Sequence, residues 1–195
     1  MTEPQLLTEP VVVVRQRPKV FSQRAEYDLF TPSGQPLGAV AEEPGSNKWL
    51  LGNFAHLRFV VSDAAGQPVL LLDKPGSWAR SRFGVLDAQE TVLGEMEQEN
   101  ILFAPQFALS AVDGSSGRLD GGRMWSWEWT IEGAAGQPVG RVTKQFAGLA
   151  EMFTAADNYV VELGPEVTGP LRAVALTACV CLDVVRDQAK RNRSS

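Results

Sequence analysis

The segment from Ala173 to Leu182 constrains the fold most strongly, because it is apolar on every side. It contains no charged residue, and Thr177 is its only polar interruption. Gly169-Pro170 precedes it, and proline is favoured in the first turn of a helix. A helix that is apolar all round has to be enclosed by protein or by lipid. Ten residues rise only about 15 Å, whereas a bilayer core needs around 20 residues. We therefore predict a helix buried inside the protein over residues 171–185.

Turn-forming residues divide most of the remaining chain into short apolar runs. The tripeptide Gly-Gln-Pro occurs three times, beginning at Gly34, Gly66 and Gly136, each time between two strand-like runs. Glycine accepts the positive φ of a tight hairpin, and proline fixes φ where the next strand begins. Degenerate copies are expected at 87–90 and in the glycine-rich stretch 113–122. Short strands with this punctuation predict an all-β barrel or sandwich.

Two further apolar patterns refine this outline. Trp125, Trp127 and Trp129 alternate along the chain, which places three indoles on one face of a strand. We interpret this face as part of the barrel core; a ligand-lining or membrane-interface stripe is the alternative, which nothing in the sequence favours. Apolar residues at steps of three and four indicate a short amphipathic helix: Phe146, Leu149, Met152 and Phe153. Residues 158–163 then return to a strand pattern.

Length and charge set the domain organisation and exclude one class of partner. The chain of 195 residues suits one domain over 11–187, with an N-terminal extension at 1–10 and a basic tail at 188–195. The net charge of −5 argues against a nucleic-acid binder, which needs a dominant basic face. Residues 186–195 carry four basic residues against one acidic, a net +3, which leaves −8 on the rest.

The inventory of reactive residues predicts no cofactor and no catalytic centre. His56 is the sole histidine, which excludes a multi-histidine metal site. Cys179 and Cys181 are too few for a disulfide scaffold and are interpreted as small hydrophobic residues. Glycine-loop and nucleophile-elbow motifs are absent from the sequence. The first residues show neither a basic segment nor an apolar run of signal length, so a cytoplasmic location is expected. The oligomeric state is left open.

Three segments near the C-terminus resemble the phospholipid scramblase and LURP-one-related family, in the tubby C-terminal-like superfamily. The first segment, Gly140–Gly148, is similar to the pattern G-x-h-x-K-Q-aromatic-x-G. The second, Ala155–Tyr159, is similar to D-A-D-N-aromatic. The third, Leu171–Cys179, is similar to h-K-A-V-x-L-x-A-C and is followed by Leu182-Asp183. The resemblance implies a closed antiparallel barrel of about twelve strands around the apolar C-terminal helix. It also implies contact with lipid headgroups.

The family's calcium motif is degenerate in this sequence. The first aspartate position is occupied by Ala155, and the remaining candidate ligands are Asp157, Asn158 and Glu162. Calcium takes six to eight oxygen ligands, and strand alternation would separate these three. We therefore expect no calcium site, with Asp157 and Asn158 acting as turn or cap residues.

The leading functional hypothesis is a non-enzymatic module that binds anionic phospholipid or a protein partner at the membrane face. The candidate lipid contacts are Arg141 and Lys144 in the family motif, together with Arg80 and Arg82 on a loop after Trp78. Lipid scrambling, as the family name suggests, is the second hypothesis, although a barrel with its helix buried offers no headgroup route. A small-ligand carrier or enzyme with a cavity at the barrel mouth is the third.

Overall fold

The computed structural model describes residues 4–17, 24–44, 56–77, 80–100, 106–121, 127–144 and 158–193. Within these ranges lie twelve strands and three helices. The strands are β1 (Val11–Gln16), β2 (Glu26–Phe30), β3 (Pro36–Glu42), β4 (Leu57–Asp63), β5 (Pro68–Lys74), β6 (Arg82–Asp87), β7 (Val92–Gln98), β8 (Gln106–Ala111), β9 (Ser116–Asp120), β10 (Glu128–Gly133), β11 (Pro138–Lys144) and β12 (Asn158–Leu163). The helices are α1 (Gln5–Thr8), α3 (Gly169–Leu176) and α4 (Ala178–Arg193).

The strands form one closed antiparallel barrel, as predicted. Each strand pairs with its neighbours in sequence, and β12 closes the ring against β1, where Val13 lies opposite Val160. Alternation along each strand directs one row of apolar side chains inward. Closure pairs the edges that an open sheet would leave exposed.

The hairpin turns follow the glycine pattern of the sequence. Gly66 and Gly136 both adopt φ of +78°, which the left-handed turn position requires. The expectation of a turn through 113–122 is wrong in its extent: the turn ends before Ser116, and residues 116–120 form β9. Position 117 of this strand is occupied by glycine, because a Cβ there would lie 2.5 Å from the Glu132 carbonyl oxygen. The glycine therefore serves a close backbone approach rather than a turn.

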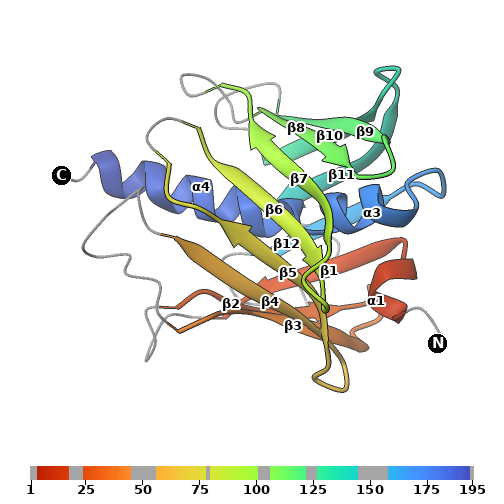
Figure 1. The fold of residues 1–195 in the computed structure, drawn as a ribbon. Helices are drawn as coiled ribbons and strands as arrows, with labels where there is room; N and C mark the ends of the chain where they lie inside the picture. The colour runs from red at the N-terminus through yellow and green to blue at the C-terminus, as the bar shows by residue number, and fades with distance from the viewer. Residues whose placement is uncertain are drawn as a thin grey trace.

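The apolar C-terminal segment runs through the middle of the barrel, which confirms the predicted enclosure (Figure 1). The helix is divided at Thr177, whose hydroxyl group and backbone N–H both donate to the Val174 carbonyl oxygen, at 2.8 and 3.2 Å. Residues Ala173 to Val185 are all buried. Helix α4 then continues to Arg193, so residues 188–193, assigned to a tail in the sequence, extend the same helix.

The two ends of the barrel differ in their connections. The five hairpins that follow β2, β4, β6, β8 and β10 are four or five residues long and define the hairpin end. The six connections that follow the odd-numbered strands are seven to fourteen residues long and define the loop end. The C-terminal part of α4 leaves through the loop end, whereas α1 and α3 lie at the hairpin end (Figure 1).

Arg172 joins the N-terminal segment to the helix at the hairpin end. Its guanidinium group donates to three carbonyl oxygens, those of Leu7 at 2.5 Å, Val167 at 3.1 Å and Glu9 at 2.6 Å. Leu6 on α1 is buried in the core. Residues 4–10 therefore pack against the barrel domain.

We expect Arg172→Met to lower the free energy of unfolding by about 2–3 kcal/mol, because three half-buried carbonyl groups lose a charged donor. Urea denaturation followed by circular dichroism measures this change. Arg118→Met is the matched control, since Arg118 pairs with Glu99 on the exposed outer face at 2.8 Å. Equal midpoints for the two variants would contradict the proposed role of Arg172.

Two expectations fall outside the described residues: the helix over Phe146 to Phe153 and the placement of Trp125. Within the described ranges, no helix combines the length and the apolar character that crossing a bilayer requires.

Candidate functional site

Five odd-numbered strands end with a polar side chain on the inner side of the barrel at the loop end. Each of these residues follows a member of the apolar core by two positions, so strand alternation turns it inward. They are Gln16, Glu42, Lys74, Gln98 and Lys144, called here the loop-end layer. The sixth strand of this set, β9, is followed by Gly121, where a Cβ would lie 2.6 Å from the Trp129 indole nitrogen.

Asp183 anchors α4 to one side of this layer. Its carboxylate accepts hydrogen bonds from Tyr27 Oη at 2.7 Å, Gln16 Nε2 at 2.8 Å and Tyr159 Oη at 3.0 Å. Burial raises the pKa of Asp183, and the hydroxyl groups of Tyr27 and Tyr159 act in the opposite direction. Burial also raises the pKa of both tyrosines, with the Asp183 charge adding to the effect. Three strands therefore hold one buried carboxylate of the helix.

A cluster of cations and aromatic rings borders Asp183 where α4 leaves the barrel. Lys144 is 5% exposed, and its Nζ lies 5.2 Å from the centre of the Tyr159 ring and 5.8 Å from that of Trp127. The Arg186 guanidinium lies 5.1 Å from the Trp127 ring and 5.5 Å from the Trp129 ring. These distances fit cation–π contacts. Trp129 is buried, as predicted. The core-face prediction is wrong for Trp127, which precedes β10 and is 50% exposed.

Lys74 occupies the opposite side of the layer. Its side chain is 1% exposed, and burial lowers the pKa of its amine. Leu57 pairs with Lys74 across β4, and the register of β6 brings Phe83 to its other side. In the part of the chain that the structure describes, no carboxylate lies within ion-pair distance of this amine. An amine in this setting is desolvated by apolar neighbours and lacks a counter-charge.

The structure separates the residues that the sequence suggested as lipid contacts. Arg141 lies on the outer face of β11 and pairs with Glu162, whereas Lys144 faces the interior, so the two do not form one surface cluster. Arg82 is exposed on β6 and contacts Glu97 at 2.9 Å and Glu95 at 3.7 Å. Arg80 is exposed at the loop end, where its carbonyl oxygen accepts from the Ser77 hydroxyl group at 2.5 Å. Their contact with lipid stays a prediction.

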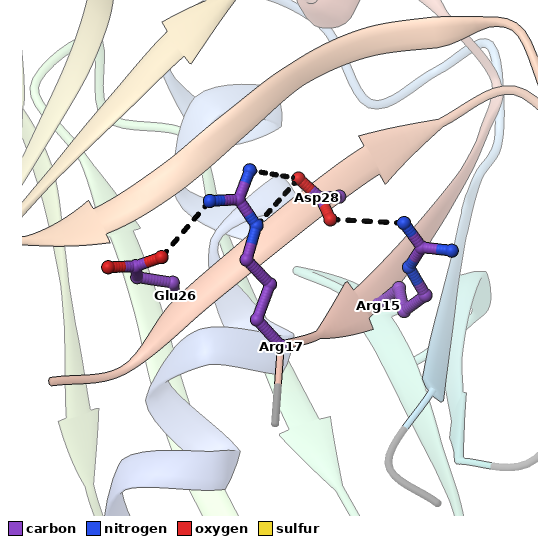
Figure 2. A network of polar contacts seen from close by, with 4 residues as sticks. All are labelled: Arg15, Arg17, Glu26 and Asp28. Atoms are coloured by element: carbon purple, nitrogen blue, oxygen red, sulfur yellow. Dashed lines mark hydrogen bonds and ion pairs between the residues drawn. The ribbon is translucent and has the colours of Figure 1, made fainter. Parts of the chain in front are cut away.

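Paired charges are a general feature of the outer face. Figure 2 shows the network on β1 and β2, where Asp28 lies between Arg15 and Arg17 and Arg17 also reaches Glu26. The Asp28 contacts measure 3.1 Å to Arg15 and 2.5 Å to Arg17. Hydrogen bonds from Arg17 lower the pKa of Asp28. Exposed pairs of this kind contribute little stability, but they neutralise surface arginines that a headgroup would otherwise meet.

The remaining candidates offer no metal or thiol chemistry in the described ranges. Asp157 lies outside these ranges, Asn158 begins β12, and Glu162 contacts Arg141. No group of three potential metal ligands occurs among the described residues. Cys179 and Cys181 are buried, and desolvation raises the pKa of both thiols, to about 12 for Cys179. Exposed His56 contacts Asp73 at 2.5 Å.

Sequence reasoning missed Lys74 and the partners of Asp183. Lys74 follows the apolar run Val69–Leu72 after Asp73, and Gln16 follows Val11–Val14 after Arg15. Two polar residues in a row usually mark the place where a strand meets solvent. The signal that could have found them is the spacing: in β5, Lys74 keeps the inward parity of Leu70 and Leu72. Continued parity at a strand end indicates an inward polar side chain.

Comparison with known proteins points to one family. The profile of the Scramblase family matches residues 9–186. A phospholipid scramblase family protein of Schizosaccharomyces pombe is 29% identical over 178 residues, which cover 80% of this chain and 46% of the relative. The chain thus spans about half the length of that curated relative. No solved structure matches the chain.

Proposed function

Because this chain belongs to the scramblase family, we propose that it is a non-enzymatic module that binds anionic phospholipid at the cytoplasmic face of a membrane. In this proposal the barrel serves as the rigid scaffold for the binding residues, and the loop end is the face that meets the lipid. Protein partners and lipid scrambling are the competing outcomes of the tests below.

The observation that carries the proposal is the half-exposed Trp127 between Lys144 and Arg186 at the loop end. Tryptophan side chains favour the boundary between headgroups and acyl chains, and basic residues beside them attract anionic lipid. Helix α4 leaves the barrel at the same end, and its last residues include Lys190, Arg191 and Arg193. The indole and the basic helix terminus therefore approach a membrane from one side.

The net charge and the ion-paired arginines limit how tightly such a surface binds an anionic membrane. The chain as a whole carries −5, and Arg82 and Arg141 are partly neutralised by their glutamate partners. Each basic residue near an anionic surface contributes about 1 kcal/mol. Screening over a Debye length of about 8 Å at physiological salt weakens these contributions. We expect binding at low salt that falls steeply as salt is added.

Co-sedimentation with phosphatidylcholine vesicles, with and without phosphatidylserine, tests the proposal. Trp127→Ser is expected to weaken binding to the anionic vesicles about fivefold, because a half-exposed indole loses roughly 1 kcal/mol of apolar burial. Val112→Ser is the matched control, since Val112 is an exposed apolar residue at the hairpin end, after β8. Thermal melting of both variants checks that the barrel remains folded.

Three further variants divide the electrostatic contribution to vesicle binding among the helix terminus, the loop end and β11. Truncation after Ala189 removes the three basic residues of the helix terminus but keeps Arg186 in its contact with Trp127. The double variant Arg80→Gln/Arg82→Gln removes two exposed cations near the loop end, and Arg141→Gln removes one from β11.

A wild-type chain that does not bind anionic vesicles at low salt would overturn lipid binding and favour a protein partner. Loss of dithionite-protected lipid signal in reconstituted vesicles would instead support scrambling.

A further inference from the structure

We infer that Lys74 is the inner contact of a site for a phosphoryl anion at the loop end of the barrel. The inference rests on the proposed function, because it names the part of the headgroup that the module would hold. The shared chemistry is a phosphate ester, which can come from a phospholipid headgroup or from a soluble phosphate ester.

The position of Lys74 distinguishes it from the rest of the loop-end layer. Glu42 accepts the Ala25 backbone N–H at 3.0 Å, and Lys144 contacts the rings of Tyr159 and Trp127. Gln98 donates to the Asn100 carbonyl oxygen at 2.7 Å, and Gln16 donates to Asp183. Among the described residues, Lys74 is thus the layer member for which the structure records no polar partner.

An unpaired buried amine is unfavourable in either protonation state. The charged form loses its hydration between Leu57 and Phe83, and the neutral form retains a polar group without a partner. An apolar side chain of similar shape would avoid both costs. A phosphoryl anion supplies acceptor oxygens and a counter-charge, and a charge-assisted hydrogen bond is strong where neighbouring atoms exclude water.

The geometry of the barrel places Lys74 at the loop end and separates it from the Trp127 cluster. Lys74 is the last residue of β5, so its amine lies at the loop end rather than midway along the barrel. In the order of strands, β5 and β11 lie six positions apart in both directions around the ring. Lys74 and Lys144 therefore face each other across the barrel with α4 between them. A variant at Lys74 leaves the Trp127 cluster in place.

Isothermal titration of the full chain with glycerol 3-phosphate, against sodium chloride of equal ionic strength, measures the site directly. We expect saturable binding to the wild type and a loss of roughly tenfold or more in affinity for Lys74→Met, because the charged hydrogen bond is removed. Arg118→Met is the control, since it removes the same unit of charge from the outer face. Without ligand, Lys74→Met is expected to melt about 2–4 °C above the wild type, because the buried amine is gone.

A parallel co-sedimentation with phosphatidylserine-containing vesicles distinguishes the two sources of phosphate. Lys74-dependent vesicle binding supports a lipid headgroup in the site. Lys74-dependent binding of glycerol 3-phosphate without vesicle binding supports a soluble phosphate ester and overturns the proposed function alone. Vesicle binding that Lys74→Met leaves unchanged, with no titration signal from glycerol 3-phosphate, overturns the Lys74 site and leaves the proposed function standing. A lower melting temperature for unliganded Lys74→Met would also overturn it, because it would show a favourable partner for the amine.

Discussion

Replacing Asp183 with leucine is expected to lower the free energy of unfolding by about 3–5 kcal/mol. Leucine has the same branching and the same number of side-chain heavy atoms, so the packing of α4 is largely kept while the carboxylate is lost. The hydroxyl groups of Tyr27 and Tyr159 and the amide of Gln16 then lose their shared acceptor. Chemical denaturation monitored by tryptophan fluorescence and by circular dichroism measures the loss.

Glu97→Leu is the matched control for Asp183→Leu. It also removes one carboxylate, but from the outer face, where Glu97 contacts Arg82 at 2.9 Å. We expect a change within about 1 kcal/mol, because exposed ion pairs contribute little. Similar losses for the two variants would show that the charge itself, and not its three buried donors, accounts for the effect.

Replacing Ala178 with lysine is expected to prevent stable folding, with a cost above about 5 kcal/mol. Ala178 has no solvent exposure and lies between Thr177 and Cys179 inside the closed barrel. The long side chain has neither the space nor a counter-charge there. The measurement is the far-ultraviolet circular dichroism spectrum and the melting curve of the purified chain.

Two variants make the Ala178 prediction informative even if the lysine variant cannot be purified. Ala178→Leu adds volume without charge and is expected to cost about 1–3 kcal/mol through overpacking. Ala189→Lys places the same charge on an exposed position of α4 and is expected to change stability by less than about 0.5 kcal/mol. A lysine variant at 178 that melts like the wild type would show that α4 is not enclosed.

The predictions for Asp183 and Ala178 have a common consequence for the loop end. Apolar contacts hold α3 and the first turns of α4, whereas Asp183 fixes the helix at the level of the loop-end layer. The next turn carries Arg186, which contacts Trp127. Weakening the Asp183 contacts should therefore loosen the proposed membrane-facing cluster along with the fold.

Local patterns in the sequence were sufficient for most of the fold. The Gly-Gln-Pro turns locate three hairpins because their backbone requirements are met by adjacent residues. The apolar run from Ala173 locates the buried helix because its burial needs no particular partner. β9 was missed because its Ser-Gly-Arg start resembles a turn, and only the approach of the Glu132 carbonyl oxygen explains Gly117.

The sequence by itself thus determined that short antiparallel strands surround one apolar helix, since turn chemistry and periodicity act over a few residues. Only the tertiary structure decided which polar residues meet. Arg141 and Lys144 are three positions apart, yet they lie on opposite faces of β11 because a strand alternates its side chains. Asp183 meets Gln16 and Tyr27 from more than 150 positions away along the chain, and Lys74 becomes a buried amine only when closure of the ring surrounds it. Such contacts depend on long-range register, because nothing in the local sequence records which strand end will lie beside which turn of the helix.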